Sequence, residues 1–221
     1  MDTLQALHSR FCARAFLDTP VAETLVRDIL EAARWAPSGV NTQPWQVAVL
    51  QGATKAMLTQ RLLAMREQAI QPNPDYAYYP ETWVEPYRMR RLVCGNGLYS
   101  ALGIAREDKD RQKIAWENNY RFFGAPVGLL FFVDKQLNQG SWLDMGMFLQ
   151  NVMLAAKSLG LDTCPQASLA EYPDVVRALL NLPDTLAVVC GMSLGYADPT
   201  QPVNQYRLPR EVVDAFTRWY A

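Results

Sequence analysis

The stretch that most restricts the fold is Trp142–Leu159, which has the length of a long helix and is apolar almost all round. A helix without a polar face has to be buried on several sides. A domain of this size covers only some of those sides, so we expect the remainder to lie at a subunit interface. The apolar residues are Met145, Met147, Phe148, Leu149, Val152, Met153, Leu154, Ala155, Ala156 and Leu159.

The rest of the chain predicts more helices and a few strands without regular βαβ alternation, which is an α+β pattern. The chain has 221 residues, half of them hydrophobic, which is enough for one sizeable core, and we expect a single domain over residues 1–221. The expected further helices are Val21–Ala36, Thr54–Ile70, Val84–Ile104, Lys109–Phe122 and Tyr172–Leu182. The expected strands are three: Trp45–Leu50, Val127–Val133 and Leu186–Leu194.

Two segments without strong periodicity have functional interest. Gln71–Pro86 is rich in Pro and Tyr, and a long loop in a compact domain is often a lid or a binding segment. A surface loop packed by its own tyrosines explains the same composition equally well. The tail, residues 195–221, begins with a Pro-rich extended piece and ends in one expected short helix. We expect it to wrap over the body or over a partner subunit.

Charge and cysteine usage exclude several classes of function. The net charge is −1 with both signs spread along the chain, which predicts neither a nucleic-acid nor a membrane partner. The four cysteines are far apart in the sequence and there is one histidine, so no metal cluster is expected. The first residues have no basic start followed by an apolar core, as a signal peptide does. We therefore expect a cytoplasmic protein with reduced thiols.

The sequence has few candidates for side-chain catalysis. Gly191–Gly195 fits G-x-S-x-G, but the hydrolase elbow needs a histidine after the serine, and His8 lies far before Ser193. We expect Ser193 to be structural. Neither G-x-G-x-x-G nor a P-loop is present, which disfavours a Rossmann or P-loop nucleotide site. If the chain is an enzyme, a cofactor is expected to carry the chemistry.

Three segments are suited to holding such a cofactor. Arg10–Arg14 places two arginines around a small residue, and guanidinium groups bind phosphate bidentately. Ala36–Trp45, A-P-S-G-V-N-T-Q-P-W, offers backbone N–H groups and polar side chains to a planar polar ring. Gln205–Arg207 adds an arginine in the tail. Taken singly, the first and last are explained by surface arginines, and the second by a helix-to-strand loop.

The order and spacing of these segments resemble the FMN-dependent nitroreductase family over essentially the whole chain. Arg10–Phe16 resembles the family's R-x-S-x-[RK]-x-F element, and Ala36–Trp45 resembles its A-P-S-x-x-N-x-Q-P-W element. Weaker matches follow in the right order: Gly124–Pro126 before a strand, Leu159–Asp162 after the apolar helix, then Gly191, Gly195 and Arg207. The resemblance implies a nitroreductase-like fold with a central mixed or antiparallel sheet flanked by helices. It also implies a homodimer with FMN sites at the subunit interface and swapped tails.

The resemblance also implies site residues. Arg10 and Arg14 would contact the FMN phosphate, ribityl chain or pyrimidine edge, and Arg207 would clamp the phosphate. Phe11, Cys12 and Gln205 would lie along the same strip. The remaining expected cofactor contacts are Pro37, Ser38, Gly39 and Asn41 from the other subunit, Asn118 and Arg121 at the pyrimidine edge, and Pro165, Gln166, Ala167 and Ser168 near flavin N5. Expected substrate contacts are Tyr76, Tyr79, Trp83 and Phe123, with Tyr78 nearby.

The function implied is that of an FMN-dependent oxidoreductase. It would take a hydride from NAD(P)H and reduce nitroaromatic compounds or quinones by a ping-pong, two-electron mechanism. An enone reductase, a dehalogenase, another same-fold flavin enzyme, a flavin-storage protein and an interaction protein without cofactor remain alternatives. Cys12 replaces the usual serine, and Gln166 stands where relatives often have glutamate, so flavin electrostatics and substrate preference are open.

Overall fold

The computed structural model describes residues 1–221 and is built around one four-stranded sheet. The strands are β1 (Gln46–Leu50), β2 (Val127–Asp134), β3 (Asp162–Gln166) and β4 (Leu186–Gly195), in the spatial order β1-β2-β4-β3. All three pairings are antiparallel. The α+β architecture is therefore confirmed, and the sheet is the antiparallel form of the two that were expected.

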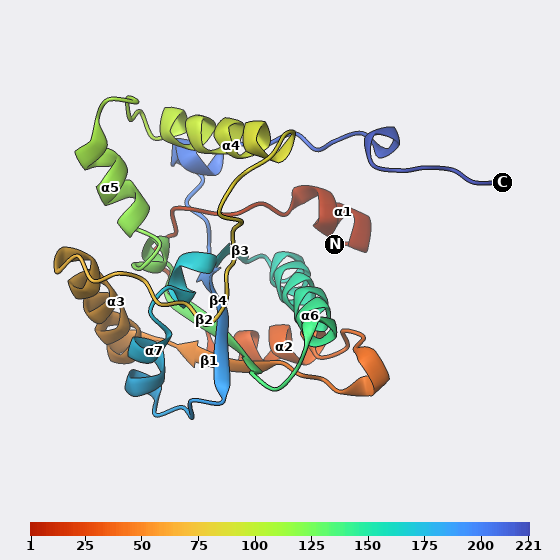
Figure 1. Ribbon diagram of the computed structural model, residues 1–221, viewed down its shortest axis with the longest axis horizontal. Helices are drawn as coiled ribbons and strands as arrows, with labels where there is room; N and C mark the ends of the chain where they lie inside the picture. Colours follow the sequence, from red (N-terminus) through yellow and green to blue (C-terminus); the bar gives the residue numbers. More distant parts are fainter.

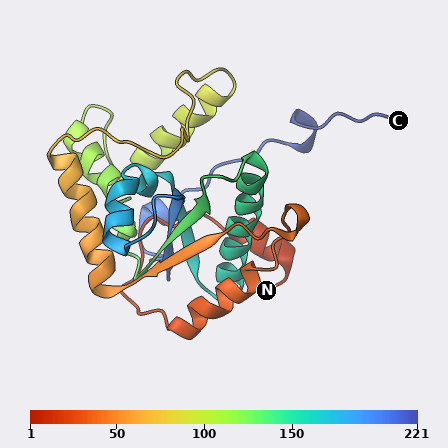
Figure 2. The ribbon, with the colours of Figure 1, turned by 60° about the horizontal axis from the view of Figure 1, so that its bottom comes forward.

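Seven α-helices surround the sheet and lie on both of its faces. They are α1 (Thr3–Ser9), α2 (Glu23–Ala33), α3 (Gly52–Glu67), α4 (Tyr87–Ala101), α5 (Lys109–Glu117), α6 (Gln139–Ser158) and α7 (Pro173–Leu180). Helices α2 and α6 cover one face, whereas α3 and α7 cover the other (Figures 1 and 2). Helices α4 and α5 lie at the top and upper left of the view in Figure 1, away from the sheet.

Burial on both faces explains why the central strands are continuously apolar. In β2, Val127, Leu129 and Phe131 pack against α2 and α6, whereas Leu130 and Phe132 face α3 and α7. A strand with one face in water would alternate polar and apolar residues. The apolar runs at β2 and β4 therefore gave the sequence analysis its strongest strand signals.

The expectation of three strands was wrong, because β3 is a fourth. Its sequence, D-T-C-P-Q, holds a proline and no long apolar run. Proline has no N–H to donate and is tolerated in strands mainly at sheet edges. Pro165 is at such an edge, because β3 pairs only with β4. Pro165 and Gln166, which were expected near the cofactor, are therefore held by the sheet.

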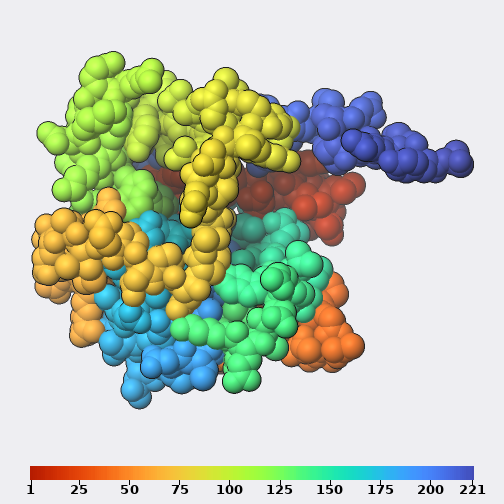
Figure 3. Space-filling view, viewed as in Figure 1, coloured from red at the N-terminus to blue at the C-terminus, as the bar shows by residue number.

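Helices α2, α4, α5 and α7 fall within the expected ranges, whereas α3 and α6 begin two and three residues before theirs, and α1 was not expected. The expected Lys109–Phe122 ends at Glu117, because Phe122 and Phe123 have positive φ values of 53° and 51°. The expected Val84–Ile104 begins only at Tyr87, after Pro86. The segment Gln71–Pro86 contains no helix or strand, as predicted. It runs as a yellow ridge across the front face in Figure 3.

The apolar helix α6 is only partly covered within one chain. Its buried stripe comprises Asp144, Met145, Phe148, Val152 and Ala156. On another side, Leu143 is 73% exposed and Met147 is 39% exposed. The helix therefore keeps an uncovered apolar face, and the subunit interface predicted there stays a prediction.

The tail differs from the expectation of a short helix. It has only two single turns of 3₁₀ helix, Pro202–Asn204 and Val213–Ala215. The first lies on the body, where Val203 and Asn204 are buried. The second projects away from the body (Figures 1 and 3) and has no buried residue. A short helix without packing partners is marginally stable in water, which explains why the end of the tail forms a single turn and not the expected helix.

Candidate functional site

The segment Arg10–Arg14 lies between β3 and the tail. The Ala13 N–H donates to the Thr163 carbonyl at 3.0 Å, and the Arg14 N–H donates to Asn204 Oδ1 at 2.8 Å. Asn204 is buried and also donates to the Ala15 carbonyl at 2.7 Å. A segment fixed by its backbone on both sides holds its side chains in a defined direction. The structure thus brings together the N-terminal and C-terminal arginine segments, which lie almost 200 positions apart.

Arg10, Arg14 and Arg207, with Phe11 and Cys12 between them, form what we call the arginine strip, and its arginines have no carboxylate partners. No acidic oxygen lies within 4.0 Å of the guanidinium of Arg10, Arg14 or Arg207, whereas many other arginines of the chain are paired. Arg207 lies 3.8 Å from the centroid of the Phe11 ring, which orients it by a cation–π contact. The Nε of Arg10 is buried without a hydrogen-bond partner. A buried charged donor without a partner is costly, so this strip is arranged for an anion.

The end of β3 lines a cavity of about 470 Å³ next to this strip. This volume lies within the range typical of small-molecule sites, about 300–1,000 Å³. Predicted site residues meet in its wall: Arg14, Tyr76, Tyr79, Pro165, Gln166, Ala167 and Ser168. The Ser168 hydroxyl oxygen is buried without a hydrogen-bond partner and is therefore a second polar atom awaiting a ligand.

Gln166 has a structural role that the sequence analysis did not foresee. Its Nε2 donates to the Asn119 carbonyl at 2.6 Å, and its Oε1 accepts from the Ser193 hydroxyl at 2.6 Å. The amide is thus engaged at both ends and fixes the Asn119 turn against the sheet. Ser193 is fully buried in β4, as expected of a structural serine, and takes no part in a catalytic triad.

The segment Gln71–Pro86, which we call the aromatic loop, covers the cavity, and its aromatic residues have different roles. The Tyr76 hydroxyl donates to the Val189 carbonyl at 2.5 Å, and its ring lies 4.4 Å from that of Trp142. Burial raises the pKa of Tyr76, which therefore stays a neutral donor. Tyr79 is exposed and its ring lies 5.6 Å from that of Trp83. Tyr76 is thus an anchor packed on the body, whereas Tyr79 and Trp83 form the outer part of the loop.

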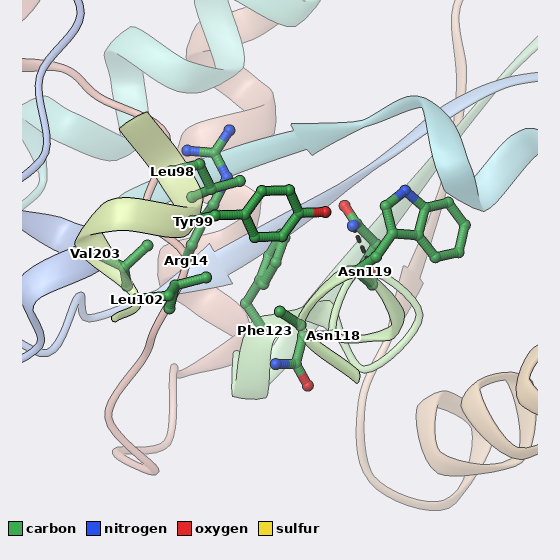
Figure 4. Close-up of a pocket in the computed structure, with 10 residues that line it drawn as sticks. Arg14, Leu98, Tyr99, Leu102, Asn118, Asn119, Phe123 and Val203 are labelled. Atoms are coloured by element: carbon green, nitrogen blue, oxygen red, sulfur yellow. Dashed lines mark hydrogen bonds between the residues drawn. The ribbon is translucent and has the colours of Figure 1, made fainter. Parts of the chain in front are cut away.

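Figure 4 shows a smaller cavity, of about 60 Å³, which shares part of its wall with the larger one. Arg14, Trp116 and Asn119 line both cavities. The smaller one also receives Asn118 and Phe123, which were expected in the site. In Figure 4 the Tyr99 ring reaches from α4 toward Asn119. Asn119, Trp116 and Tyr99 were missed by the sequence analysis, although the polar run N-N-Y-R around Asn119 was a usable signal.

Other predicted residues lie outside both cavities. Arg121 is exposed and pairs with Glu117 at 3.8 Å. Gln205 is exposed and donates to the Pro199 carbonyl at 2.8 Å. Pro37, Ser38, Gly39 and Asn41 are at the end of α2, and none lines either cavity of this chain.

The Ala36–Trp45 stretch is held by an acidic residue that the sequence analysis missed. Both carboxylate oxygens of Asp144, on α6, lie 3.2 Å from the Gly39 N–H that donates to them. Within the loop, Ser38 Oγ accepts from the Gln43 N–H at 3.0 Å. Val40 and Asn41 adopt positive φ values of 44° and 60°. The loop is therefore a formed structure that presents its outer residues, with Val40 97% exposed.

Two of the cysteines, far apart in the sequence, are neighbours in the structure. Cys12 forms a β-bridge with Thr163, which brings its thiol next to that of Cys164. The neighbouring Cys164 thiol, together with the positive charges of Arg14 and Arg10, outweighs burial and lowers the pKa of Cys12 to about 6. Burial and the Cys12 thiol raise the pKa of Cys164. Cys12 stands where the family's motif has serine, so this position of the segment carries a thiol with a lowered pKa in place of a hydroxyl.

The protein is an α+β protein whose candidate site is suited to binding an anionic ligand with a planar ring. Unpaired guanidinium groups stand beside a cavity roofed by aromatic rings. No set of three His, Cys, Asp or Glu side chains is arranged to hold a metal ion. No helix combines the length and the hydropathy needed to cross a bilayer.

Comparison with known proteins identifies the family. The nitroreductase family model matches residues 7–196, so the chain belongs to the nitroreductase family. The chain is 43% identical to 4-nitrobenzoate reductase of Pseudomonas putida, over 96% of this chain and 92% of that protein. It is 42% identical to nitrobenzene nitroreductase of Ectopseudomonas oleovorans, over 96% and 93%. These matches confirm the resemblance seen in the sequence.

A solved structure shows the same fold throughout. The crystal structure of the FMN-dependent nitroreductase NfnB from Mycobacterium smegmatis in complex with NADPH gives a TM-score of 0.94 at 35% identity. The match covers 99% of this chain and 97% of that one. The nitroreductase-like fold is therefore confirmed over almost the full length of the chain.

Proposed function

We propose that this chain is an FMN-dependent oxidoreductase that takes a hydride from NAD(P)H and reduces nitroaromatic compounds. The observation that carries the proposal is the unpaired arginine strip beside the aromatic-roofed cavity. The relatives support the same reading, because two are named for nitroaromatic substrates and the third is described as FMN-dependent and complexed with NADPH. Quinones remain in the proposed acceptor range.

The residues present fit FMN. Arg10 Nε and Ser168 Oγ are buried polar atoms without partners, and a phosphorylated, polar ring system would satisfy both. Arg10 and Arg207 would hold the phosphate, with Phe11 orienting Arg207. Arg14, which lines the cavity, would face the pyrimidine edge. Ala167 and Ser168 would lie along the ring.

The mechanism divides the work between cofactor and protein. When bound, FMN supplies the two-electron chemistry between the nicotinamide and the acceptor. Arg14 contributes a fixed positive charge, which stabilises negative charge as it develops at the pyrimidine edge. Gln166 holds the Asn119 turn in place and keeps the wall of the cavity rigid. Tyr79 lines the larger cavity and offers a ring face to an aromatic acceptor, whereas Trp83 packs beside Tyr79 outside this cavity and limits the access of water.

A carboxyl group in the cavity wall is the candidate proton donor to the acceptor. Glu171 is the one carboxyl group that lines the larger cavity. Burial raises the pKa of Glu171, although the hydrogen bond donated by the Tyr120 hydroxyl opposes this. A carboxyl group with a raised pKa is suited to giving a proton to a nitro oxygen as that oxygen gains charge.

A spectral titration tests the proposed function. The purified protein with FMN is expected to absorb near ~450 nm, to bleach under anaerobic conditions with NADPH or NADH, and to recover with a nitroaromatic compound. Bleaching and recovery in separate steps follow from a ping-pong mechanism. A flavin that stays oxidised with both nucleotides would instead indicate a storage protein. A protein that remains colourless after FMN is added would contradict the cofactor assignment.

We also propose that the functional unit is a homodimer in which residues 1–221 form one domain and the tail crosses to the partner. Asp144 accepts a hydrogen bond from the Gly39 N–H. The apolar side chains of Leu143 and Val40, next to these two residues in the sequence, are both exposed. The tail presents Phe216, Trp219 and Tyr220, each at least 71% exposed. A cytoplasmic location is proposed as well, since all four cysteines are free.

Sedimentation tests the dimer. Wild-type protein is expected to sediment as a dimer at micromolar concentration, and Leu143→Asp is expected to shift it toward the monomer, because a buried unpaired carboxylate is costly. Ile70→Asp is the matched control, because Ile70 is also exposed but lies after α3 on the opposite face. A monomeric wild-type protein would refute the proposal, as would equal effects of the two variants.

A further inference from the structure

A third hollow, open to the surface and of about 650 Å³, borders the 470 Å³ cavity at Tyr79. It lies between the aromatic loop and α4, along which its lining runs from Tyr87 to Tyr99. Its walls include the rings of Trp83, Tyr87 and Tyr99 and the guanidinium groups of Arg90 and Arg91. We call it the α4 groove.

The α4 groove is positive. No aspartate or glutamate lines it. Arg90 is partly neutralised by Glu211 of the tail, at 3.0 Å. Arg91 has no acidic oxygen within 4.0 Å, and its guanidinium lies 5.4 Å from the centroid of the Trp83 ring. The free cation of the groove is therefore Arg91, and an aromatic ring holds it in place.

This combination of groups matches one end of a phosphorylated adenosine. A phosphate monoester carries a charge of about −1.5 to −2 at pH 7 and accepts bidentate hydrogen bonds from arginine. Aromatic side chains provide stacking faces for a base, and each stacked base contributes measurably to binding. Tyr79 lines both hollows, so the groove borders the cavity, and we infer that one extended ligand spans the two.

We propose that the α4 groove binds the adenosine 2′-phosphate of NADPH through Arg91, with the nicotinamide end in the larger cavity. This inference rests on the proposed function and makes it more specific, because NADH lacks the 2′-phosphate. Arg91 is thus a specificity-determining residue that selects NADPH over NADH. Arg90, already paired with Glu211, lines the groove as a weaker secondary contact.

Binding of nucleotide fragments tests the groove independently of turnover. Calorimetric titration of the FMN-loaded protein is expected to show 2′,5′-ADP binding at least about tenfold more tightly than 5′-AMP, because only the former has the 2′-phosphate. Arg91→Gln is expected to remove this difference, and Arg91→Lys to retain part of it. Arg88→Gln is the matched control, since Arg88 is on the same helix but pairs with Glu85 at 2.7 Å and does not line the groove.

Steady-state kinetics provide a second readout. Arg91→Gln is expected to raise KM for NADPH about tenfold or more and to leave KM for NADH unchanged. Equal affinity of wild type for the two fragments would overturn the proposal, as would equal losses in Arg91→Gln and Arg88→Gln. It would also fall if Arg91→Gln weakened 4-nitrobenzoate but not 2′,5′-ADP. If neither nucleotide reduced the flavin, the proposed function would fail, while the fragment titration would still decide the groove.

Discussion

Asp75→Ala is expected to lower the free energy of unfolding by about 3–5 kcal/mol, because it removes the only buried carboxylate partner of Arg177 and leaves that guanidinium with exposed carboxylates alone. Asp75 accepts from Arg177 at 2.7 Å, from the Val188 N–H at 2.9 Å and from Lys135 at 2.9 Å. The side chains of Asp75 and Arg177 are each only 7% exposed. Arg177 would keep Asp174 and the Leu186 carbonyl as its main partners.

Urea unfolding of the wild type and two variants measures this effect. Asp174→Ala is the matched control, since Asp174 also pairs with Arg177 but is 67% exposed. A surface ion pair contributes about 0–1 kcal/mol, so this control is expected to change stability little. Similar losses in the two variants would show that burial of the Asp75 pair does not stabilise the fold.

The pH dependence of the free energy of unfolding tests the same ion pair. Burial by itself raises the pKa of Asp75. The hydrogen bonds from Arg177, Val188 and Lys135 lower it by more than burial raises it, so the pKa in the folded state lies below its usual value. A depressed carboxyl pKa contributes stability that is present above the unfolded pKa, near 4, and is lost as pH falls through the folded pKa. The stability gap between wild type and Asp75→Asn is therefore expected to narrow below about pH 4.

The Asp75 contact also matters for the site. Asp75 directly precedes Tyr76, so it fixes the start of the aromatic loop to β4 and α7. Tyr76 then adds its own hydrogen bond to Val189. Two adjacent anchors on β4 hold the loop that roofs the larger cavity and, through Tyr79, borders the α4 groove.

Arg10→Ala is expected to weaken FMN binding by about 10- to 100-fold with the fold intact, because a hydrogen bond to a charged group contributes about 1.5–3 kcal/mol. The Arg10 Nε is buried without a protein partner, so removing the guanidinium breaks no native hydrogen bond at that atom. Stability without FMN is therefore expected to change far less than the affinity for FMN.

Fluorescence quenching of FMN on titration with protein measures the affinity. Arg27→Ala is the control, because Arg27 is exposed and pairs with Glu23 at 2.6 Å on α2. Unfolding of each variant without FMN separates folding from binding. A variant Arg10→Ala that keeps wild-type affinity would remove Arg10 from the phosphate contacts, and a variant that unfolds without FMN would make Arg10 structural.

Particular residues show how far local sequence carried the site prediction. Arg10, Arg14 and Arg207 were predicted from two short motifs, and the structure brings their segments together through Asn204. Pro165–Ser168 were predicted to lie near flavin N5; they line the cavity, and the first two of them belong to the edge strand β3. Asn119 was missed in favour of its neighbours Asn118 and Arg121, because residue type alone does not tell which side of a turn faces inward.

The sequence by itself determined the class of fold, the family and the segments that carry the site. Apolar runs buried on both faces of the sheet, helical periodicity and the A-P-S-G-V-N-T-Q-P-W stretch are local patterns, so they can be read without coordinates. Only the tertiary structure decided which groups meet. Asp75 and Arg177 are 102 positions apart, Cys12 lies next to Cys164, and Asp144 holds Gly39 across 105 positions. Such contacts form when the chain packs, and they depend on distance in space, which no local pattern records.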